Sequence, residues 1–471
     1  MNPPTQSVVS RRDVLRLGGC GFGWLGFAGL CADMTQRAAA AQGSSLAPRM
    51  PLLPARARRV IFLFMHGGPS QVDTFDYKPR LLRDHGKLMP VRAGDLVAPN
   101  SRLLASPFPF AQHGESGLFI SSLFPELAKH ADHLCLLRGM HTDGQAHGQS
   151  VLKLHTGHET QLRPSMGSWI IYGLGTENQN LPGFVTISPS ILNGGPQNYG
   201  SAFLPAIYQG TPIGNDATPL SQSQIRHISN PNLPPARQRE QLDLIQSMNR
   251  AHLARAQVDA HLEGVIESYE LAFRMQAEGP KLMDLGGESK ATRDLYGVDT
   301  KPTDNFARQC LLARRLAEKG VRFVQVNHAF KWDQHANLKT DLERNAAEVD
   351  RPIAALLSDL HERGLLDDTL VVWGGEFGRT PTAQGRMDGR DHNPHGFTMW
   401  LAGGGVRRGF SHGATDEHGY RAVENTVHMH DLHATVLHLL GLDHRRLTYR
   451  HAGRDYRLTD VKGSVVTDII T

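Results

Sequence analysis

Short apolar runs alternate with amphipathic stretches along much of the chain. The first run, Arg59 to Met65, is continuous and contains β-branched and aromatic residues, which is typical of a strand buried on both faces of a parallel sheet. Five similar runs follow: His133–Leu137, Gly183–Ile187, Val321–Val326, Thr369–Trp373 and Phe397–Leu401. Helical patterns are also present: Ser121–Ala131, Asn305–Lys319, Leu338–Arg363 and Leu432–Leu440. This alternation, clearest in the C-terminal part, predicts a doubly wound α/β fold with a mostly parallel sheet.

The segment from Ala236 to Ala277 differs from its surroundings. It contains no proline and is rich in Gln, Arg, Ala, Leu and Glu, which predicts one or two long amphipathic helices over residues 236–278. We expect an inserted helical segment, either a cap or lid or an ordinary peripheral helix pair. Before it, residues 188–235 are dense in Pro, Asn, Gly and Ser and predict a long irregular segment, a kind that is often functional in a compact protein.

The C-terminal helix has well-marked ends. Asp431 is the expected N-cap, and Gly441 is the expected stop. Three histidines, His428, His430 and His433, gather around the start of this helix. Since His433 lies on the capped helix itself, we expect capping and packing from this group rather than metal ligation.

The first 41 residues have the pattern of an export signal. Ser10 to Leu15 contain a twin-arginine motif, and an apolar, glycine-rich stretch and the alanine run Ala38–Ala41 follow it. We therefore expect a twin-arginine signal peptide over residues 1–41, a Pro/Arg linker over 42–57, and one domain over 58–471. This predicts export to the periplasm or the extracellular space.

The apolar part of the signal is about 15 residues long, which is too short to span a bilayer that needs about 20 residues. No later segment reaches that length, so the sequence predicts no transmembrane span in the mature chain. The alternative is that the N-terminal segment stays uncleaved as an anchor.

The composition is that of a globular protein, with 40% hydrophobic and 20% charged residues among 471. Lys and Arg number 50 against 46 acidic residues and form no long block, which argues against a nucleic-acid partner. The 25 histidines add a functional hint, because imidazoles transfer protons and bind metals near neutral pH. Cys135 and Cys310 lie in apolar runs and are expected to be buried free thiols, with one disulfide as the alternative. No pattern in the sequence indicates an oligomeric state.

Polar side chains follow several of the predicted strands. In open α/β sheets, ligands bind at the carboxyl ends of the strands, so these residues are expected at one edge. We expect them to form a shared metal or anion site, and the candidates are His66 after the first strand, Asp333 and His335 after the strand at 321–326, Glu376 and Arg379 after the strand at 369–373, and Arg390 and His392 shortly beyond.

Asp333 and His335 are two residues apart, which lets both side chains point one way from an extended segment. A mixed oxygen and nitrogen set suits Zn²⁺, Mn²⁺ or Fe better than Ca²⁺. Glu376 lies in a glycine-flanked turn, where the backbone can approach a ligand closely.

Arg379 and Arg390 could each bind a phosphate or sulfate group through two hydrogen bonds, a geometry that lysine lacks. In that role they would stabilise negative charge that develops during ester hydrolysis. The alternative for both is a structural ion pair with Asp388 or Asp391.

The nucleophile is less clearly marked. His147 and Ser150 precede a helical stretch, and a hydroxyl at a helix N-terminus is well placed for anions. Ser150 and Thr142 are candidate nucleophiles, and His147 is a candidate base, metal ligand or nucleophile. The alternative for Ser150 is a plain N-cap.

Six segments carry a family resemblance: His66-Gly-Gly-Pro-Ser-Gln-Val-Asp-Thr-Phe-Asp76, His155-Thr-Gly157, Pro164-Ser-Met-Gly-Ser-Trp169, Gly374-Gly-Glu-Phe-Gly-Arg-Thr-Pro381, Gly389-Arg-Asp-His-Asn-Pro394 and His430-Asp-Leu-His-Ala-Thr435. With them the chain resembles the bacterial secreted family catalogued as domain of unknown function 1501, which is grouped with the alkaline phosphatase and sulfatase superfamily. The resemblance covers nearly all of the mature chain.

The resemblance implies a three-layer α/β/α sandwich and, as in the phosphatase members, up to two divalent metal ions and a Ser or Thr nucleophile. Asp333, His335 and His392 resemble the Asp/His/His set of one metal, and Glu376 stands where an Asp-His-Gly motif places its Asp. Phe377 replaces the His of that motif. The expected cofactor is therefore one or two divalent ions, Zn²⁺ or Mn²⁺.

His66 stands near the position where the superfamily's first strand ends in a metal-binding Asp. We expect an exported metal-dependent hydrolase of phosphate or sulfate esters, acting on a small-molecule or glycan substrate, with His66, His147 and Ser150 as competing bases or nucleophiles. The alternative is a catalytically eroded anion- or glycan-binding protein on the same scaffold, which Phe377 favours.

Two other activities are excluded by sequence. A formylglycine sulfatase needs a C/S-x-P-x-R motif, and Cys135-Leu-Leu-Arg138 lacks both its proline and its spacing. A serine esterase of the α/β-hydrolase type needs a G-x-S-x-G elbow at a turn from a strand into a helix, and the one match, Gly409-Phe-Ser-His-Gly413, is not followed by a predicted helix before Leu432.

Overall fold

The computed structural model describes residues 45–471 except 93, 224, 226–231, 257–259 and 385–387. The expected signal peptide lies outside the described residues. Among the described residues, no helix is long and apolar enough to cross a membrane.

Nine strands of the described chain form one central sheet, in the order β12-β4-β11-β8-β1-β7-β5-β6, with β15 paired to β4. Their bounds are β1 Arg59–Met65, β4 Leu134–His141, β5 Phe184–Ile187, β6 Thr211–Ile213, β7 Phe323–His328, β8 Thr369–Gly374, β11 Phe397–Ala402, β12 Phe410–His412 and β15 Val427–His428. Strand β1 pairs in parallel with β7 and β8, and β11 is antiparallel to both β8 and β4. The sheet confirms the predicted mostly parallel α/β fold.

The remaining strands form two-stranded ribbons at the periphery: β2 Phe110–His113 with β3 Leu118–Ser121, β9 Gly378–Arg379 with β10 His392–Asn393, β13 Ala414–Thr415 with β14 Ala422–Glu424, and β16 Tyr449–His451 with β17 Arg454–Tyr456. The α-helices are α2 Gln71–Thr74, α3 Pro79–Arg83, α4 His147–Thr156, α5 Met166–Leu174, α6 Pro235–Ala256, α7 Ala260–Met283, α8 Lys290–Tyr296, α9 Asp304–Glu318, α10 Leu338–Glu362 and α11 Met429–Leu439.

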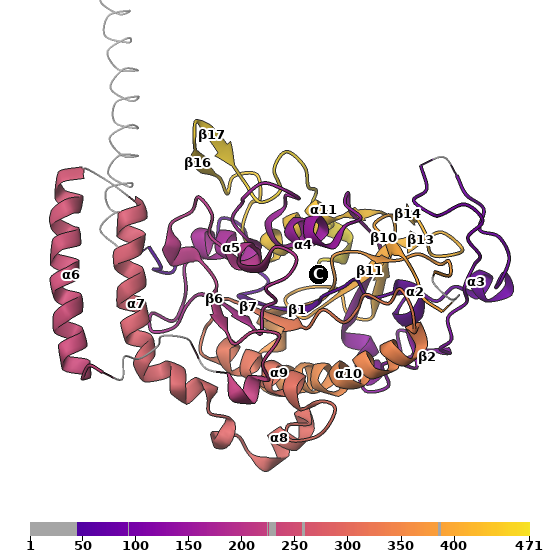
Figure 1. Cartoon of the computed structure of the whole chain (residues 1–471), viewed down its shortest axis with the longest axis horizontal. Coiled ribbons are helices and arrows are strands. Elements are labelled where there is room, and N and C mark those ends of the chain that lie inside the picture. Colours follow the sequence, from indigo (N-terminus) through magenta and orange to yellow (C-terminus); the bar gives the residue numbers. More distant parts are fainter. Residues whose placement is uncertain (1–44, 93, 224, 226–231, 257–259, 385–387) are drawn as a thin grey trace, which may run out of the picture.

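Helices cover both faces of the sheet, so the molecule has three layers (Figure 1). All residues of β1 are buried, and alternate side chains point to opposite faces. Ile61 and Leu63 belong to the apolar core beneath α9 and α10, whereas Phe62 and Phe64 belong to the core beneath α4, α5 and α11. This two-sided burial explains why the strand has a continuous apolar sequence rather than an alternating one.

The described part of residues 236–278 lies in α6 and α7, which pack against each other beside the β6 end of the sheet (Figure 1). The guanidinium of Arg239 links the two helices through two hydrogen bonds of 2.8 Å to the carboxylate of Glu270. The preceding segment is irregular where it is described, apart from β6 and short 3₁₀ turns.

Two local predictions are wrong. The helix expected over Ser121–Ala131 is a 3₁₀ helix restricted to Leu127–His133, because Pro125 disfavours a helical conformation in the residue before it. At the C-terminal helix the N-cap is His428, and Asp431 is the third residue of a capping box whose carboxylate accepts from the His428 N–H at 2.8 Å.

The other expectations for the C-terminal helix are confirmed. Gly441 follows the helix with φ of +77°, a left-handed conformation that suits glycine. His430 and His433 donate from Nε2 to the carbonyl oxygens of Gly157 and Leu154 at 2.8 and 2.7 Å. They therefore hold the C-terminal turn of α4 against α11. Cys135 and Cys310 are buried free thiols, as expected.

Candidate metal centre

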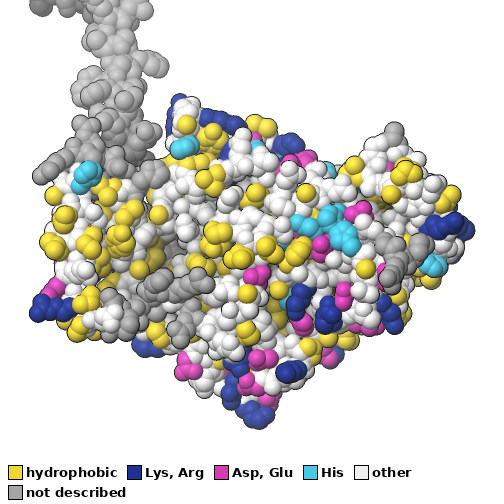
Figure 2. All heavy atoms as spheres, viewed as in Figure 1, with side chains coloured by type: hydrophobic (Ala, Val, Ile, Leu, Met, Phe, Trp, Pro, Cys, Tyr) yellow, Lys and Arg dark blue, Asp and Glu magenta, His cyan; other side chains and the backbone are white. Residues whose placement is uncertain are grey.

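Four side chains from distant parts of the chain meet at one edge of the sheet. His147 is the first residue of α4 and follows β4, Asp333 and His335 follow β7, and His392 lies in β10, which precedes β11. Since β4 and β7 run in the same direction and β11 runs against them, all of these segments lie at the carboxyl edge of the parallel strands. Figure 2 shows histidine side chains gathered at the surface over the region of α4 and β10.

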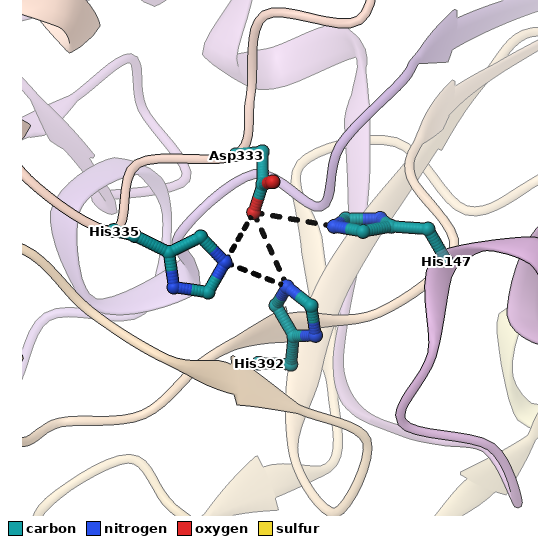
Figure 3. A group of neighbouring side chains, drawn as sticks. All are labelled: His147, Asp333, His335 and His392. Carbon is teal, nitrogen blue, oxygen red and sulfur yellow. Dashed lines mark hydrogen bonds and ion pairs between the residues drawn. The ribbon is translucent and has the colours of Figure 1, made fainter. Parts of the chain in front are cut away.

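Asp333 is the centre of this group (Figure 3). Its Oδ1 lies 3.2 Å from Nε2 of His147, 2.9 Å from Nε2 of His335 and 3.2 Å from Nε2 of His392. The Nε2 atoms of His335 and His392 are 3.0 Å apart. All four ligand atoms lie within 4.8 Å of one another, so the group could hold a metal ion.

The other ring nitrogen of each histidine faces an acceptor. We therefore assign the proton to Nδ1 in all three rings, which leaves a lone pair on each Nε2. Three lone pairs and a carboxylate oxygen then converge, and such a set repels itself unless a cation lies between its members. The acceptors are Glu376 Oε1 at 2.6 Å from His147, Gln384 Oε1 at 2.6 Å from His335, and the Gln145 carbonyl oxygen at 2.8 Å from His392.

The distances fit the same interpretation. Ligand atoms bound to one ion at about 2.0–2.2 Å lie roughly 3 Å apart, which agrees with the separations of 2.9–3.2 Å around Asp333. Imidazole nitrogens with one carboxylate oxygen suit Zn²⁺, Mn²⁺ or Fe. The residues present therefore fit a divalent transition-metal ion.

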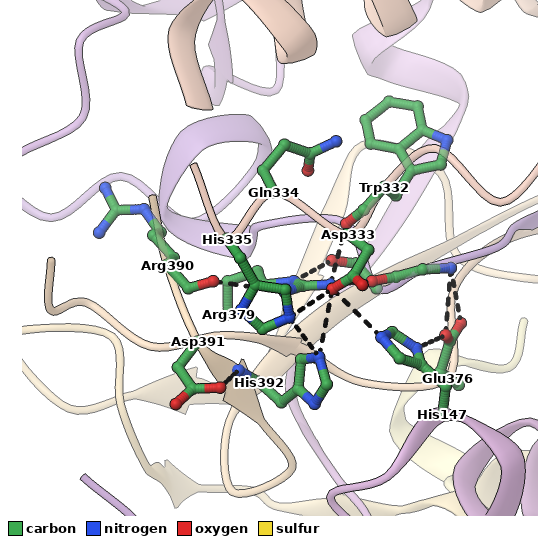
Figure 4. A network of polar contacts seen from close by, with 12 residues as sticks. His147, Trp332, Asp333, Gln334, His335, Glu376, Arg379, Arg390, Asp391 and His392 are labelled. Carbon is green, nitrogen blue, oxygen red and sulfur yellow. Dashed lines mark hydrogen bonds and ion pairs between the residues drawn. The ribbon is translucent and has the colours of Figure 1, made fainter. Parts of the chain in front are cut away.

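The guanidinium of Arg379 fixes the Asp333 carboxylate (Figure 4). Its Nη2 lies 2.6 Å from Asp333 Oδ1, and its Nε donates to the Gly68 carbonyl oxygen at 3.0 Å. Burial would raise the pKa of Asp333, but hydrogen bonds from His147, His392 and Arg379 outweigh it and hold this pKa far below its usual value. The carboxylate is therefore ionised at any working pH.

Glu376 is fully buried behind His147 and outside the four-residue group. Its two oxygens accept from the Gly67 N–H at 3.1 and 3.2 Å, and Oε1 also accepts from His147. Burial would raise the pKa of Glu376, but the hydrogen bond with His147 and the charges nearby lower it. For His147, burial would lower the pKa, but its bonds to Asp333 and Glu376 raise it. Without a metal ion this imidazole therefore favours a second proton on Nε2, and a bound ion would take the place of that proton.

Two further residues expected at the site lie outside the group. His66 is buried, and its Nε2 lies 2.9 Å from the amide nitrogen of Asn193. Ser150 is buried inside α4 rather than at its N-cap, and its hydroxyl donates to the Gly144 carbonyl oxygen at 2.8 Å.

Arg390 is also buried, and it forms an ion pair with Asp73 through hydrogen bonds of 2.7 and 3.1 Å. Its third nitrogen donates to the Thr380 carbonyl oxygen at 3.3 Å. Both arginines therefore form ion pairs, Arg379 with Asp333 and Arg390 with Asp73. Neither pairs with Asp388 or Asp391, the partners considered from the sequence.

His147 was the hardest of the four to place from sequence. The predicted strand ended at Leu137, whereas β4 continues to His141, so His147 follows the strand much more closely than the pattern indicated. Gln384 and the carbonyl of Gln145 carry no sequence signal, because any hydrogen-bond acceptor could hold an imidazole Nδ1–H.

Two phenylalanines border the group. The ring centroid of buried Phe377 lies 4.7 Å from that of His392 and 4.9 Å from that of His147. The half-buried Phe330 lies 4.9 Å from His147 and 4.7 Å from His66. The edge of the site is therefore aromatic.

Fold and site together define a three-layer α/β protein with a candidate metal centre of three histidines and one aspartate at the strand ends. The chain belongs to the family described as "Protein of unknown function (DUF1501)", which it matches over residues 57–470. No curated protein matches the chain in sequence.

Several solved structures are distantly similar. The lipoteichoic acid synthase LtaP from Listeria monocytogenes is 8% identical, with 88% of this chain and 78% of that chain covered and a TM-score of 0.38. The PsFucS1 sulfatase from Pseudoalteromonas sp. is 13% identical, with 82% and 68% covered and a TM-score of 0.35. A mutant of TAB5 alkaline phosphatase is 10% identical, with 75% and 92% covered and a TM-score of 0.31.

Proposed function

We propose that this protein is a metal-dependent hydrolase of phosphate or sulfate esters, with one divalent ion held by His147, Asp333, His335 and His392. The observation that carries the proposal is the orientation of the three imidazoles, each with Nδ1 facing an acceptor and Nε2 facing the same carboxylate oxygen. Hydrogen bonding of the second ring nitrogen is the usual way in which proteins orient metal-binding histidines.

The bound ion would polarise the ester and lower the pKa of a water molecule. Around it, Glu376 keeps His147 in one tautomer, and Arg379 keeps the Asp333 carboxylate in place and ionised. The hydroxyl of Ser150 donates to the Gly144 carbonyl oxygen, which supports water rather than this serine as the nucleophile.

The number of protein ligands bears on the choice of metal. Four ligands complete the tetrahedral shell that Zn²⁺ takes in structural sites, and catalytic zinc sites keep one position open. A six-coordinate ion such as Mn²⁺ leaves room for both an ester oxygen and a water molecule. We therefore propose Mn²⁺ for a catalytic centre, with zinc as the alternative.

The second candidate function is that of an anion- or glycan-binding protein that no longer catalyses. It is favoured over catalysis by the pairing of Arg379 with Asp333 and of Arg390 with Asp73, because neither guanidinium is then free to stabilise charge that develops during hydrolysis. It predicts that anionic ligands bind the metal-loaded protein and are released unchanged.

Metal analysis and a substrate panel test the two proposals. The protein is purified without added metal, its metal content is measured by mass spectrometry, and aryl phosphates, phosphodiesters and aryl sulfates are assayed after loading with Mn²⁺ or Zn²⁺. The hydrolase proposal expects turnover of at least one ester that His392→Ala abolishes. The exposed His252→Ala serves as the control and should behave like the wild type. Binding of an ester without turnover supports the second candidate. A protein that contains no metal and binds no ester would contradict both candidates.

Export is a separate proposal, which rests on the twin-arginine motif at Arg11 and Arg12. Replacing both by lysine in the full chain should retain the protein in the cytoplasm of a bacterium with a twin-arginine pathway. Unchanged export would contradict the proposal.

A further inference from the structure

A small cavity lies at the end of β1, the strand that pairs with β7, and the loop after β7 carries Asp333. His66, which follows β1, forms one wall, Ser188 and Asn198 line it from the segment after β5, and Asp216 lines it from the loop after β6. The space open to the centre of a water molecule is about 10 Å³, which is close to what one water or one hydroxyl group needs.

Three of the lining side chains have polar atoms without a partner. They are His66 Nδ1, Ser188 Oγ and Asn198 Oδ1, all buried and without a hydrogen bond. The residues are 1%, 2% and 7% exposed. Buried polar atoms in proteins are nearly always hydrogen-bonded, so three unpaired atoms around one space indicate an occupant.

The backbone around this cavity is held in a costly conformation. Ser188 and Asn193 both have φ of +51°, in the left-handed region that asparagine tolerates and serine rarely adopts. Asn193 joins two of the walls, because its side-chain nitrogen lies 2.9 Å from His66 Nε2 and its carbonyl oxygen accepts from the Asn198 amide at 3.1 Å. Strain of this kind concentrates where a protein holds a ligand, and in Ser188 it coincides with an unpaired hydroxyl.

His66 connects the cavity to the metal centre. Its carbonyl oxygen accepts from the Trp332 N–H at 3.1 Å, and Trp332 directly precedes Asp333. Its ring and that of His147 both contact Phe330, at centroid distances of 4.7 and 4.9 Å. The cavity and the metal centre are therefore neighbours at the same edge of the sheet.

The lining indicates what kind of group fits. It contains no Lys or Arg, and burial lowers the pKa of His66, so this imidazole is neutral near pH 7. The carboxylate of Asp216 disfavours an anion in the cavity and can accept from a donor. A neutral group that both donates and accepts hydrogen bonds, such as an alcohol hydroxyl, matches this set.

We propose that the cavity formed by His66, Ser188 and Asn198 is a specificity subsite for a hydroxyl group on the alcohol part of the ester substrate, which makes polyol and sugar esters the preferred class. The proposal rests on the proposed function of the metal centre. It assigns the contacts as a hydrogen bond from the substrate hydroxyl to Asn198 Oδ1 and further hydrogen bonds with Ser188 Oγ and His66 Nδ1.

Two ligands that differ in their hydroxyls test the subsite. Glycerol 1-phosphate and propyl phosphate are titrated into the Mn²⁺-loaded protein by calorimetry, with the corresponding sulfate esters in parallel. Glycerol 1-phosphate should bind about tenfold more tightly, which is the effect of one or two neutral hydrogen bonds. Ser188→Gly removes the hydroxyl and suits the positive φ, so it should fold, lose the tenfold preference and bind propyl phosphate as the wild type does.

Asn198→Ala should lose the preference as well, and Ser223→Ala, which changes a hydroxyl bonded to the Pro219 carbonyl, serves as the control. Equal affinity for the two ligands, no binding of either, or a preference that persists in Ser188→Gly would overturn the subsite. So would a crystal structure in which a water molecule stays in the cavity beside bound glycerol 1-phosphate. If the protein prefers glycerol 1-phosphate but hydrolyses no ester, the proposed function is wrong and the subsite stands. If it hydrolyses esters but shows no preference between the two ligands, the subsite is wrong and the proposed function stands.

Discussion

The Nδ1 atom of His147 lies 2.6 Å from the carboxylate of Glu376, although 229 positions separate the two residues in the sequence. Glu376 is fully buried and is itself fixed by the Gly67 N–H. A buried carboxylate that holds an imidazole in this way fixes the ring and makes its other nitrogen a stronger metal ligand. Glu376 therefore orients His147 for metal binding without being a ligand itself.

Glu376→Gln should weaken metal binding by about 10- to 100-fold, because the amide accepts a weaker hydrogen bond from His147 and no longer fixes its tautomer. The dissociation constant is measured by competition with a chromophoric chelator. Glu348→Gln provides a matched control, since Glu348 accepts from His328 at 2.9 Å in a pair outside the metal group. Equal metal affinity in the two variants would show that Glu376 does not act on the site.

Metal binding should stabilise the fold, because the four ligands come from three separate segments of the chain. At a free metal concentration 100 times the dissociation constant, the gain is about 2.7 kcal/mol. Adding a chelator should therefore lower the melting temperature of the wild type and leave that of Asp333→Ala unchanged, since this variant lacks the shared oxygen ligand. A wild type that melts at the same temperature with and without chelator would contradict the metal centre.

The ion pair of Arg390 with Asp73 should be structural. Both side chains are fully buried, so Arg390→Met leaves an unpaired buried carboxylate and should destabilise the protein by about 3–5 kcal/mol in urea unfolding. The double variant Arg390→Met, Asp73→Asn should recover much of this loss. The opposite result, normal stability of Arg390→Met with weakened phosphate binding, would support the anion-binding role considered from the sequence.

Stability should fall in mild acid because of buried neutral histidines. Burial lowers the pKa of His155 to about 4 and that of His433 to about 3, against an unfolded value of 6.5. Because the folded pKa values are the lower ones, their contribution to stability is complete above pH 6.5 and is lost as the pH falls below it. Each histidine should cost up to about 1.4 kcal/mol per pH unit between pH 6.5 and its folded pKa.

His433→Gln tests this pH dependence. The variant removes one titrating group, so its unfolding free energy should fall less steeply between pH 6.5 and 4.5 than that of the wild type. Urea unfolding at several pH values measures the slopes, and the exposed His252→Gln should keep the wild-type slope. Parallel curves for His433→Gln and the wild type would refute the assignment.

Much of the fold was predictable because its signals are local. The continuous apolar sequence of residues 59–65 reflects burial on both faces, and it identified the central strand without any knowledge of its neighbours. Asp333 and His335 were predicted together because a spacing of two residues in an extended segment places both side chains on one side, and their ligand atoms are 2.9 Å apart. The ends of strands are also visible locally in the sequence. Because the carboxyl ends of parallel strands meet at one edge of the sheet, the site was expected at that edge.

The α/β class, the buried strands, the free thiols and the residue types available at the strand ends could be predicted from the amino-acid sequence. The folded structure adds that His147 completes the group, that Glu376 stands behind it, and that Arg390 pairs with Asp73 across 317 positions. The difference comes from the range of the interactions. Burial and periodicity act between near neighbours in sequence, whereas hydrogen bonds within 3.2 Å depend on how separate loops pack, and many acceptors in the chain could satisfy the same donor equally well.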